Sequence, residues 1–225
     1  LVDLGGNGVA CFWSESRSFI NGFDIYLQTI DVDGNTQLVS GGIAVAESNG
    51  DDYIKDIIPT PDGNYLIFWV EEIWPASRLK YNKIDQSGNT AIGWPPSGYS
   101  LSNQSFEANN VSVKKISDAG GVLAVWNQDG NFSDVYVQKI NWDGVAQWQD
   151  FGVPVSVADN DQSAISFDID AGGSYAFIAW EDYRNGNDYN ILGKEIDLNS
   201  GSISSDDIYF SSDTTSQQSP LVKAV

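Results

Sequence analysis

The stretch GGSYAFIAWEDYR, at Gly172–Arg184, decides the fold because the chain contains three further versions of it. Each version has a glycine-containing turn, an apolar run that ends in tryptophan, and then a polar or acidic segment. The other three are Gly8–Arg17, Gly63–Glu72 and Gly120–Asp129. The tryptophans recur about every 55 residues, and a fixed period of this length is typical of repeat folds. We call them the anchor tryptophans: Trp13, Trp69, Trp126 and Trp180.

The residues around each anchor tryptophan predict four short strands per repeat. The tryptophan strand is apolar on both faces, as expected for a strand that lies between packed sheets. A half-polar strand, a hairpin turn rich in Asp, Asn and Gly, and a short fourth strand follow it. Helical periodicity is absent from the sequence. We therefore expect an all-β chain, a β-propeller with four-stranded antiparallel blades and four visible repeats.

The repeats divide the chain into a single propeller region over residues 1–225. Their approximate bounds are 1–52, 53–110, 111–163 and 164–219, with 220–225 starting or closing a blade. Both ends, Leu1–Leu4 and Ser219–Val225, have the register of a first strand. Two arrangements are consistent with a first strand at both ends. One is a small ring closed by strand exchange, and the other is a fragment of a larger propeller. The start at Leu1 without a methionine and the small number of repeats favour the fragment.

Composition narrows the classes of partner. Eleven basic residues stand against thirty-one acidic ones, which gives a net charge of −20. Such a surface repels phosphate backbones and anionic lipids, so we expect no nucleic-acid partner. No apolar run reaches transmembrane length, so we expect no membrane insertion. The absence of histidine excludes histidine acid–base chemistry and histidine metal sites. The single Cys11 is expected to be a small buried hydrophobe.

The repeat pattern of G-G, an apolar run, W-x-D-x-R, D-I-Y-x-Q-x-I-D and G-x-x-V-S resembles the propeller repeats of large secreted or cell-surface bacterial proteins from Bacteroidetes-like organisms. The stretches that carry the resemblance are Trp180–Arg184 with Asp188–Asp197, Trp13–Arg17 with Asp24–Asp31, and Asp134–Ile140. It covers the whole chain, and it implies a secreted or cell-surface location, an association with type IX secretion and membership of a larger polypeptide or surface complex. The second repeat departs most from the pattern.

Features that occur in every repeat belong to the scaffold, and features that occur in one repeat are better candidates for function. By this rule the anchor tryptophans are structural. Trp74, in the loop that the second repeat places after its tryptophan strand, is the first candidate for a ligand-facing residue. Exposed aromatic side chains stack on sugars or anchor protein partners. Local packing beneath the loop is the competing interpretation.

Three arginines, Arg17, Arg78 and Arg184, fall in or beside the loops that join second and third strands. On one propeller face they could clamp a carboxylate, as in sialidases. However, Arg17 and Arg184 both stand four residues after an anchor tryptophan, so pairing with the neighbouring Glu15 and Asp182 competes with a ligand role. A properly formed sialidase Asp-box is absent.

The turn DVDGN at Asp31–Asn35 has alternating oxygen donors, so Asp31 and Asp33 are possible calcium ligands. An ordinary hairpin turn is the competing interpretation, because the segment is too short for an EF-hand. No other cofactor is indicated.

These features predict a secreted or cell-surface, non-catalytic interaction or adhesion module that binds a protein or a glycan. A fragment of a propeller glycoside hydrolase or sialidase-like enzyme is the alternative, and a structural spacer is the second alternative. The chain is expected not to be an enzyme. The reason is that the adjacent acids Glu71/Glu72 and Glu181/Asp182 point to opposite faces of a strand, whereas glycosidase carboxylates must flank one bond.

Overall fold

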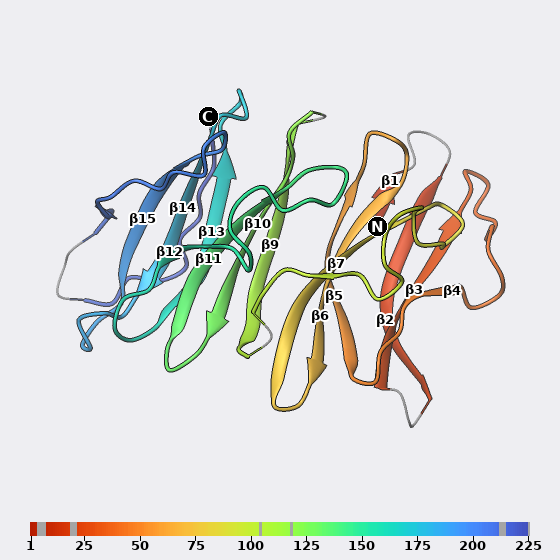
Figure 1. Cartoon of the computed structure of the whole chain (residues 1–225), viewed down its shortest axis with the longest axis horizontal. Coiled ribbons are helices and arrows are strands. Elements are labelled where there is room, and N and C mark those ends of the chain that lie inside the picture. Colours follow the sequence, from red (N-terminus) through yellow and green to blue (C-terminus); the bar gives the residue numbers. More distant parts are fainter. Residues whose placement is uncertain (4–7, 19–21, 104, 118, 212–214, 225) are drawn as a thin grey trace. The chain divides into compact units, whose positions relative to one another are not determined.

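A computed structural model describes residues 1–3, 8–18, 22–103, 105–117, 119–211 and 215–224. These residues form sixteen strands in four four-stranded antiparallel sheets, and they contain no helix (Figure 1). Accordingly, the described part of the chain offers no helix that could span a membrane. The all-β, four-bladed architecture confirms the predicted fold class.

Each sheet follows chain order, so each blade is a simple meander. The first two blades consist of β1 (Val2–Asp3), β2 (Val9–Ser18), β3 (Gly22–Ile30) and β4 (Ile43–Ala46), then β5 (Asp51–Pro59), β6 (Tyr65–Ile73), β7 (Ala76–Ile84) and β8 (Tyr99–Ser100). The last two consist of β9 (Glu107–Ser117), β10 (Gly121–Asp129), β11 (Ser133–Ile140) and β12 (Val153–Ser156), then β13 (Gln162–Ile169), β14 (Tyr175–Asp182), β15 (Asn190–Asp197) and β16 (Ile208–Tyr209).

The chain forms two compact units. The first, Leu1–Ser105, contains the first and second blades, and the second, Phe106–Val225, contains the third and fourth. The predicted repeat bounds lie close to the starts of β5, β9 and β13. Whether the repeats belong to one closed ring or to a longer propeller stays a prediction.

Packing between consecutive blades makes the core of each unit. In the second unit, Leu123, Val125 and Val137 of the third blade lie in one cluster with Ile178 and Trp180 of the fourth. In the first unit, Phe12 and Leu27 of the first blade cluster in the same way with Ile67 and Trp69 of the second. Within each unit, one apolar face of each tryptophan strand is therefore covered by the other blade of that unit.

A glycine lies against the ring of three anchor tryptophans. Gly152 has a φ of +86°, and a Cβ added there would lie 2.4 Å from Cη2 of Trp126. Gly42 and Gly98 hold the same place against Trp13 and Trp69. A side chain would meet both the ring and an unfavourable backbone conformation, so the position requires glycine.

The indole N–H of the anchor tryptophan donates to a carboxylate in three blades. These bonds are 2.8–3.0 Å long and join Trp13 to Glu15, Trp69 to Asp52, and Trp180 to Asp182. In the third blade the indole nitrogen of Trp126 is buried and has no hydrogen-bond partner among the residues described.

The strands are longer than the sequence predicts. The tryptophan strands continue past tryptophan into segments that were expected to be loops. In the second blade the β6–β7 pairing extends to Ile73 and Ala76, so the turn consists of Trp74 and Pro75 alone, joined by a cis peptide bond. A tight hairpin thus replaces the predicted loop because cross-strand pairing is satisfied up to its tip.

Candidate functional site

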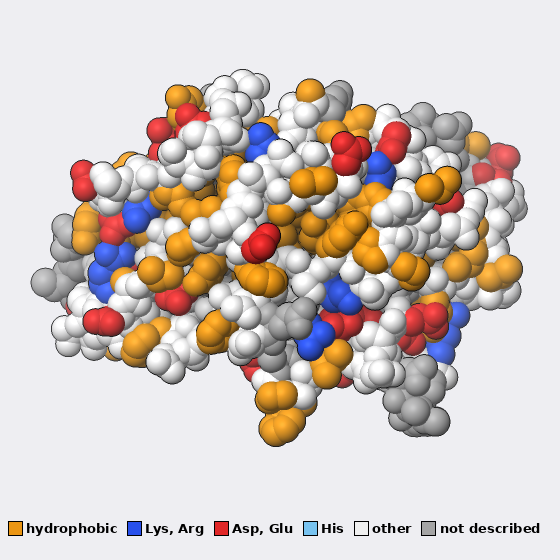
Figure 2. All heavy atoms as spheres, viewed as in Figure 1, with side chains coloured by type: hydrophobic (Ala, Val, Ile, Leu, Met, Phe, Trp, Pro, Cys, Tyr) orange, Lys and Arg blue, Asp and Glu red, His pale blue; other side chains and the backbone are white. Residues whose placement is uncertain are grey.

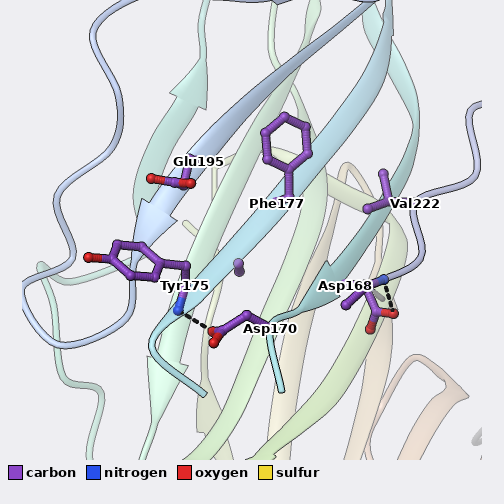
Figure 3. Close-up of a pocket in the computed structure, with 8 residues that line it drawn as sticks. Asp168, Asp170, Tyr175, Phe177, Glu195 and Val222 are labelled. Carbon is purple, nitrogen blue, oxygen red and sulfur yellow. Dashed lines mark hydrogen bonds between the residues drawn. The ribbon is translucent and has the colours of Figure 1, made fainter. Parts of the chain in front are cut away.

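A cavity of about 140 Å³ lies on one face of the fourth blade (Figure 3). Two aromatic side chains and three carboxylates line it, together with the last residues of the chain. The residues that matter for its chemistry are Asp168, Asp170, Tyr175, Phe177, Glu195 and Val222.

Strand register brings these side chains together. Asp168 of β13 lies opposite Phe177 of β14, and Phe177 lies opposite Glu195 of β15. Directly opposite residues in antiparallel strands project from the same face, so the three side chains form one row across the blade. Tyr175 shares that face because it precedes Phe177 by two residues. In Figure 3, Tyr175 and Glu195 lie on one side of Phe177, and Asp168 lies on the other.

The end of the chain forms a wall of this cavity. The backbone N–H groups of Val222 and Ala224 donate to Ser166 Oγ and Asp168 Oδ2, each at 2.9 Å. No strand is assigned to this segment, which corrects the predicted strand at 221–225 as far as Ala224; Val225 lies outside the described residues. The segment is held by side chains instead of a backbone ladder.

The contacts of this end segment with the fourth blade resemble those that the first strand of one blade makes with the blade before it. In the first unit, the N–H of Ile54 in β5 donates to Ser14 Oγ of the first blade at 3.1 Å. In the fourth blade, the residue equivalent to Ser14 is Glu181, and its Oε1 accepts from the N–H of Ser219 at 2.7 Å. The last segment therefore lies along the fourth blade as β5 lies along the first.

Two of the cavity's carboxylates are engaged by the protein. Asp168 accepts from Lys114 Nζ at 2.9 Å and lies 3.0 Å from Lys223 Nζ. The Lys114 bond, then the Ala224 N–H and Lys223, hold the pKa of Asp168 well below its usual range, so it stays ionised. Asp170 accepts from the backbone N–H of Tyr175, which is the main reason that its pKa is lowered.

Glu195 differs from these two acids. Its side chain is exposed, and its carboxylate has no hydrogen bond or ion pair within the described residues. The cavity therefore combines two aromatic rings with one free acceptor. Rings and a free carboxylate suit a ligand with apolar faces and hydroxyl donors. No group of acids or cysteine able to hold a metal ion occurs in the part of the chain described.

A second acid cluster lies in the second blade. Asp52 of β5 is directly opposite Glu71 of β6, and both are buried. Burial, and then the charge of Glu71, raise the pKa of Asp52 to about 7. Glu71 is bound by Lys80 at 3.1 Å and lies 3.6 Å from Arg78. A protonated acid beside a charged one is the arrangement of many glycosidases.

The cluster of Asp52 and Glu71 is not a ligand site, because a ligand has no space to reach it. The hollow beside Asp52, Glu71 and Lys80 has a volume of about 10 Å³. A space of that size holds no more than about one water molecule. Asp52 and Glu71 therefore cannot reach a sugar in this conformation.

Trp74 projects from the hairpin turn between β6 and β7 and is 93% exposed. The competing interpretation was that Trp74 packs beneath its loop, and a side chain with this exposure does not do so. Its ligand contact stays a prediction.

Arg17 and Arg184 each bind an acid of their own blade. Arg17 lies 2.8 Å from Glu15 and stacks on the ring of Tyr26 at 3.6 Å. Arg184 contacts both oxygens of Asp182, each at 2.7 Å. The predicted pairing with neighbouring acids is thus present.

Arg78 and Asp182, the other two candidates, also have partners. Arg78 faces Glu71 from the opposite strand. Asp182 is 1% exposed and accepts from Trp180 and Arg184, which leaves it no access to a ligand in this conformation. A ligand role for the three arginines stays a prediction.

Asp31 acts as a turn residue. Its Oδ1 accepts from the backbone N–H groups of Asp33 and Asn35 at 3.0 and 2.8 Å. Asp85 and Asn141 make the same pattern in the next two blades. Calcium at Asp31 and Asp33 stays a prediction, and a chelator that lowered the melting temperature would support it.

Tyr175 and Glu195 were missed from the sequence. The signal that could have identified Glu195 is its departure from the repeat: the third blade has Lys139 at the equivalent position, and the second has Lys83. Lys139 donates to the carbonyl of Leu198 in the fourth blade at 2.9 Å. An acid at this position cannot make that bond.

No protein-family model and no curated protein matches the sequence of this chain. Solved structures do match its fold. The endo-arabinase of Bacteroides thetaiotaomicron is matched with a TM-score of 0.52 at 11% identity, over 95% of this chain and 80% of that one. A puromycin hydrolase is matched with a TM-score of 0.50 at 12% identity, over 97% of this chain but 31% of that one. An α-L-arabinofuranosidase of Lactobacillus brevis is matched at 0.42, which is too weak to support an argument.

The match to the endo-arabinase overturns the prediction that the chain is not an enzyme. The fold is shared with an endo-arabinase over nearly all of this chain, so a propeller of this kind does not indicate a non-catalytic module. The error arose because the prediction considered only acids adjacent in sequence, whereas strand register brings together acids from different strands, such as Asp168 and Glu195 in one row across the fourth blade. At 11% identity the match shows the fold alone.

Proposed function

We propose that this chain is a carbohydrate-acting propeller, either a glycoside hydrolase or the propeller part of one. The observation that carries the proposal is the fourth-blade cavity, which the rings of Tyr175 and Phe177 line together with the free carboxylate of Glu195. Sugar rings present apolar faces and hydroxyl donors, which aromatic rings and carboxylates complement. The fold shared with an endo-arabinase supports hydrolysis and makes arabinan the first substrate to test.

The spacing of acids in the cavity bears on the reaction. Glycosidases use two carboxyl groups, about 5–5.5 Å apart in retaining enzymes and about 6.5–9.5 Å apart in inverting ones. Asp168 and Glu195 lie in one row with β14 between their strands, which separates their backbones by roughly 9–10 Å. That figure describes the backbones, and the distance between the two carboxyl groups is what separates the retaining from the inverting arrangement. Glu195 is the group able to exchange a proton with a ligand, because the oxygens of Asp168 are occupied by lysines and Ala224.

The test is release of reducing ends from arabinan and other neutral polysaccharides. Glu195→Gln should lower the rate by about 100-fold or more if the carboxyl group transfers a proton. Glu107→Gln is the matched control, because Glu107 is an exposed acid of the same unit that does not line the cavity. No release from any polysaccharide by the unaltered chain would refute hydrolysis. Equal rates for both variants would remove Glu195 from it.

The secreted or cell-surface location, the link to type IX secretion and the larger polypeptide or surface complex stay part of this proposal. They are supported by the sequence resemblance of the repeats. Fractionation of a native producer, with detection of the chain in the medium or on the surface, would test them.

A further inference from the structure

The size of the fourth-blade cavity limits what it can hold. Its volume is about 140 Å³. A protein cavity of roughly 150 Å³ accepts one benzene molecule, and pockets for drug-sized ligands begin at about 300 Å³. One five- or six-membered ring therefore fills this cavity, and the rest of a longer ligand must lie outside it.

The lining determines how such a ring is held. Tyr175 is 45% exposed, so one part of its ring is available to a ligand at the cavity mouth. Phe177 is fixed from the side by an edge contact with Phe210, at 5.7 Å between ring centroids. Apolar Val222 and Ala224, from the end segment of the chain, line the cavity on the side of Asp168 (Figure 3). The site thus has aromatic surfaces on one side and an apolar wall on the other.

The charges of the lining exclude anions. Both lysines near the cavity, Lys114 and Lys223, are bound to Asp168. Glu195 and Asp170 add two negative charges to the lining, and neither has an ion pair within the described residues. The chain carries a net charge of −20, and Figure 2 shows few and scattered basic side chains on the face drawn. An anionic ring would meet repulsion with no free cation to offset it.

We propose that the cavity is a subsite for one ring of a neutral furanose or pyranose, with Tyr175 as the stacking residue and Glu195 as the acceptor for sugar hydroxyl groups. Uronic acid rings are excluded by Glu195 and Asp170. Tyr175 and Glu195 determine specificity. Asp168 is a positioning residue, because it holds the end segment of the chain through the N–H of Ala224. The inference rests on the proposed function in taking the ligand to be a glycan.

The test is calorimetric titration of the full chain with a neutral arabino-oligosaccharide and with an oligogalacturonate of similar length. The unaltered chain should bind the first and not the second. Tyr175→Ala should weaken binding by about tenfold or more, since stacking on the ring is lost. Tyr209→Ala is the matched control, because Tyr209 is an exposed tyrosine of the same blade outside the cavity and should leave affinity unchanged. Far-UV circular dichroism checks that each variant is folded.

Glu195→Gln separates charge from shape. It should weaken neutral binding several-fold and allow measurable binding of the oligogalacturonate, because the repulsion is reduced while the volume is kept. If neutral glycans bind or are cleaved but Tyr175→Ala and Glu195→Gln behave as the unaltered chain, the subsite is wrong and the proposed function stands. If oligogalacturonate binds the unaltered chain equally well, the neutral class is wrong. If no glycan is bound or cleaved, both proposals fail.

Discussion

The second and fourth blades use acids in opposite ways. In both blades, the indole N–H of the anchor tryptophan donates to a carboxylate. The acceptor is Asp52 in the second blade and Asp182 in the fourth. Asp182 is neutralised by the guanidinium of Arg184. Asp52 has another acid, Glu71, directly opposite, and its pKa is raised to about 7.

The difference shows how one repeat can give either a closed polar core or an open cavity. The second blade buries Asp52 and Glu71 near Lys80, and the hollow beside them has space for about one water molecule. The fourth blade balances its buried acid locally and leaves Glu195 unpaired at the cavity, within the part of the chain described. Where the cations lie decides which acid is free for a ligand.

The largest difference is expected when a lysine is removed from each blade. Lys80→Ala leaves the buried Glu71 with only the more distant Arg78, and breaking a buried pair costs about 3 kcal/mol or more. Lys223→Ala removes a partner whose side chain is 80% exposed, and it should cost less than about 1 kcal/mol. Urea unfolding at neutral pH measures both. Equal losses would mean that the second-blade cluster is not closed to water.

The dependence of stability on pH should expose the same contrast. Because the folded pKa of Asp52, about 7, lies above the unfolded value near 4, the folded state keeps a proton that the unfolded state has lost between these values. The contribution of Asp52 to the free energy of unfolding is fully present below about pH 4. It is lost as pH rises toward 7, and the free energy of unfolding falls by about 2–4 kcal/mol over this range. Asp52→Asn should flatten this part of the curve.

The exposed Asp150→Asn is the control and should keep the slope of the unaltered chain. Asp168 in the fourth blade acts in the other direction. Its pKa is lowered, chiefly by Lys114, so its contribution is present above the unfolded pKa and is lost as pH falls. An unchanged curve for Asp52→Asn would show that Asp52 titrates normally.

The sequence was sufficient to predict the blade itself. Tryptophan spacing, apolar runs and Asx–Gly turns are local signals, and they placed β6, β10 and β14 around their anchors. The clasp of Arg184 on Asp182 was also predictable, because both partners lie within one turn of the chain. Such features depend on residues that are neighbours in sequence.

The site was not predictable for the opposite reason. Asp52 faces Glu71 only because a bulge shifts β5 between Ile54 and Asp56. The cavity needs two registers, from Asp168 to Phe177 and on to Glu195, and an end segment that contacts residues 56 positions away. A pattern of residue types carries no information on how distant strands are paired.

Arginine substitution should give a smaller difference between the blades. Arg184 grips Asp182 with two nitrogens and also contacts Asp207 at 2.5 Å. Lysine cannot reproduce this fork, so Arg184→Lys should cost about 1–2 kcal/mol. Arg78→Lys changes one contact of 3.6 Å and should cost less than about 0.5 kcal/mol. Thermal unfolding of the two variants is the measurement, and a larger loss for Arg78→Lys would contradict the comparison.

The smallest effect on stability is expected at Trp74, the exposed tip of the second blade. The side chain is 93% exposed, so Trp74→Ala removes little buried surface and should change the free energy of unfolding by less than about 0.5 kcal/mol. For this reason the variant is a clean probe of function. Any loss of glycan affinity would report direct contact with Trp74, whereas the same loss in Tyr175→Ala alone would place recognition in the fourth blade. A marked fall in melting temperature would show that Trp74 is packed in solution.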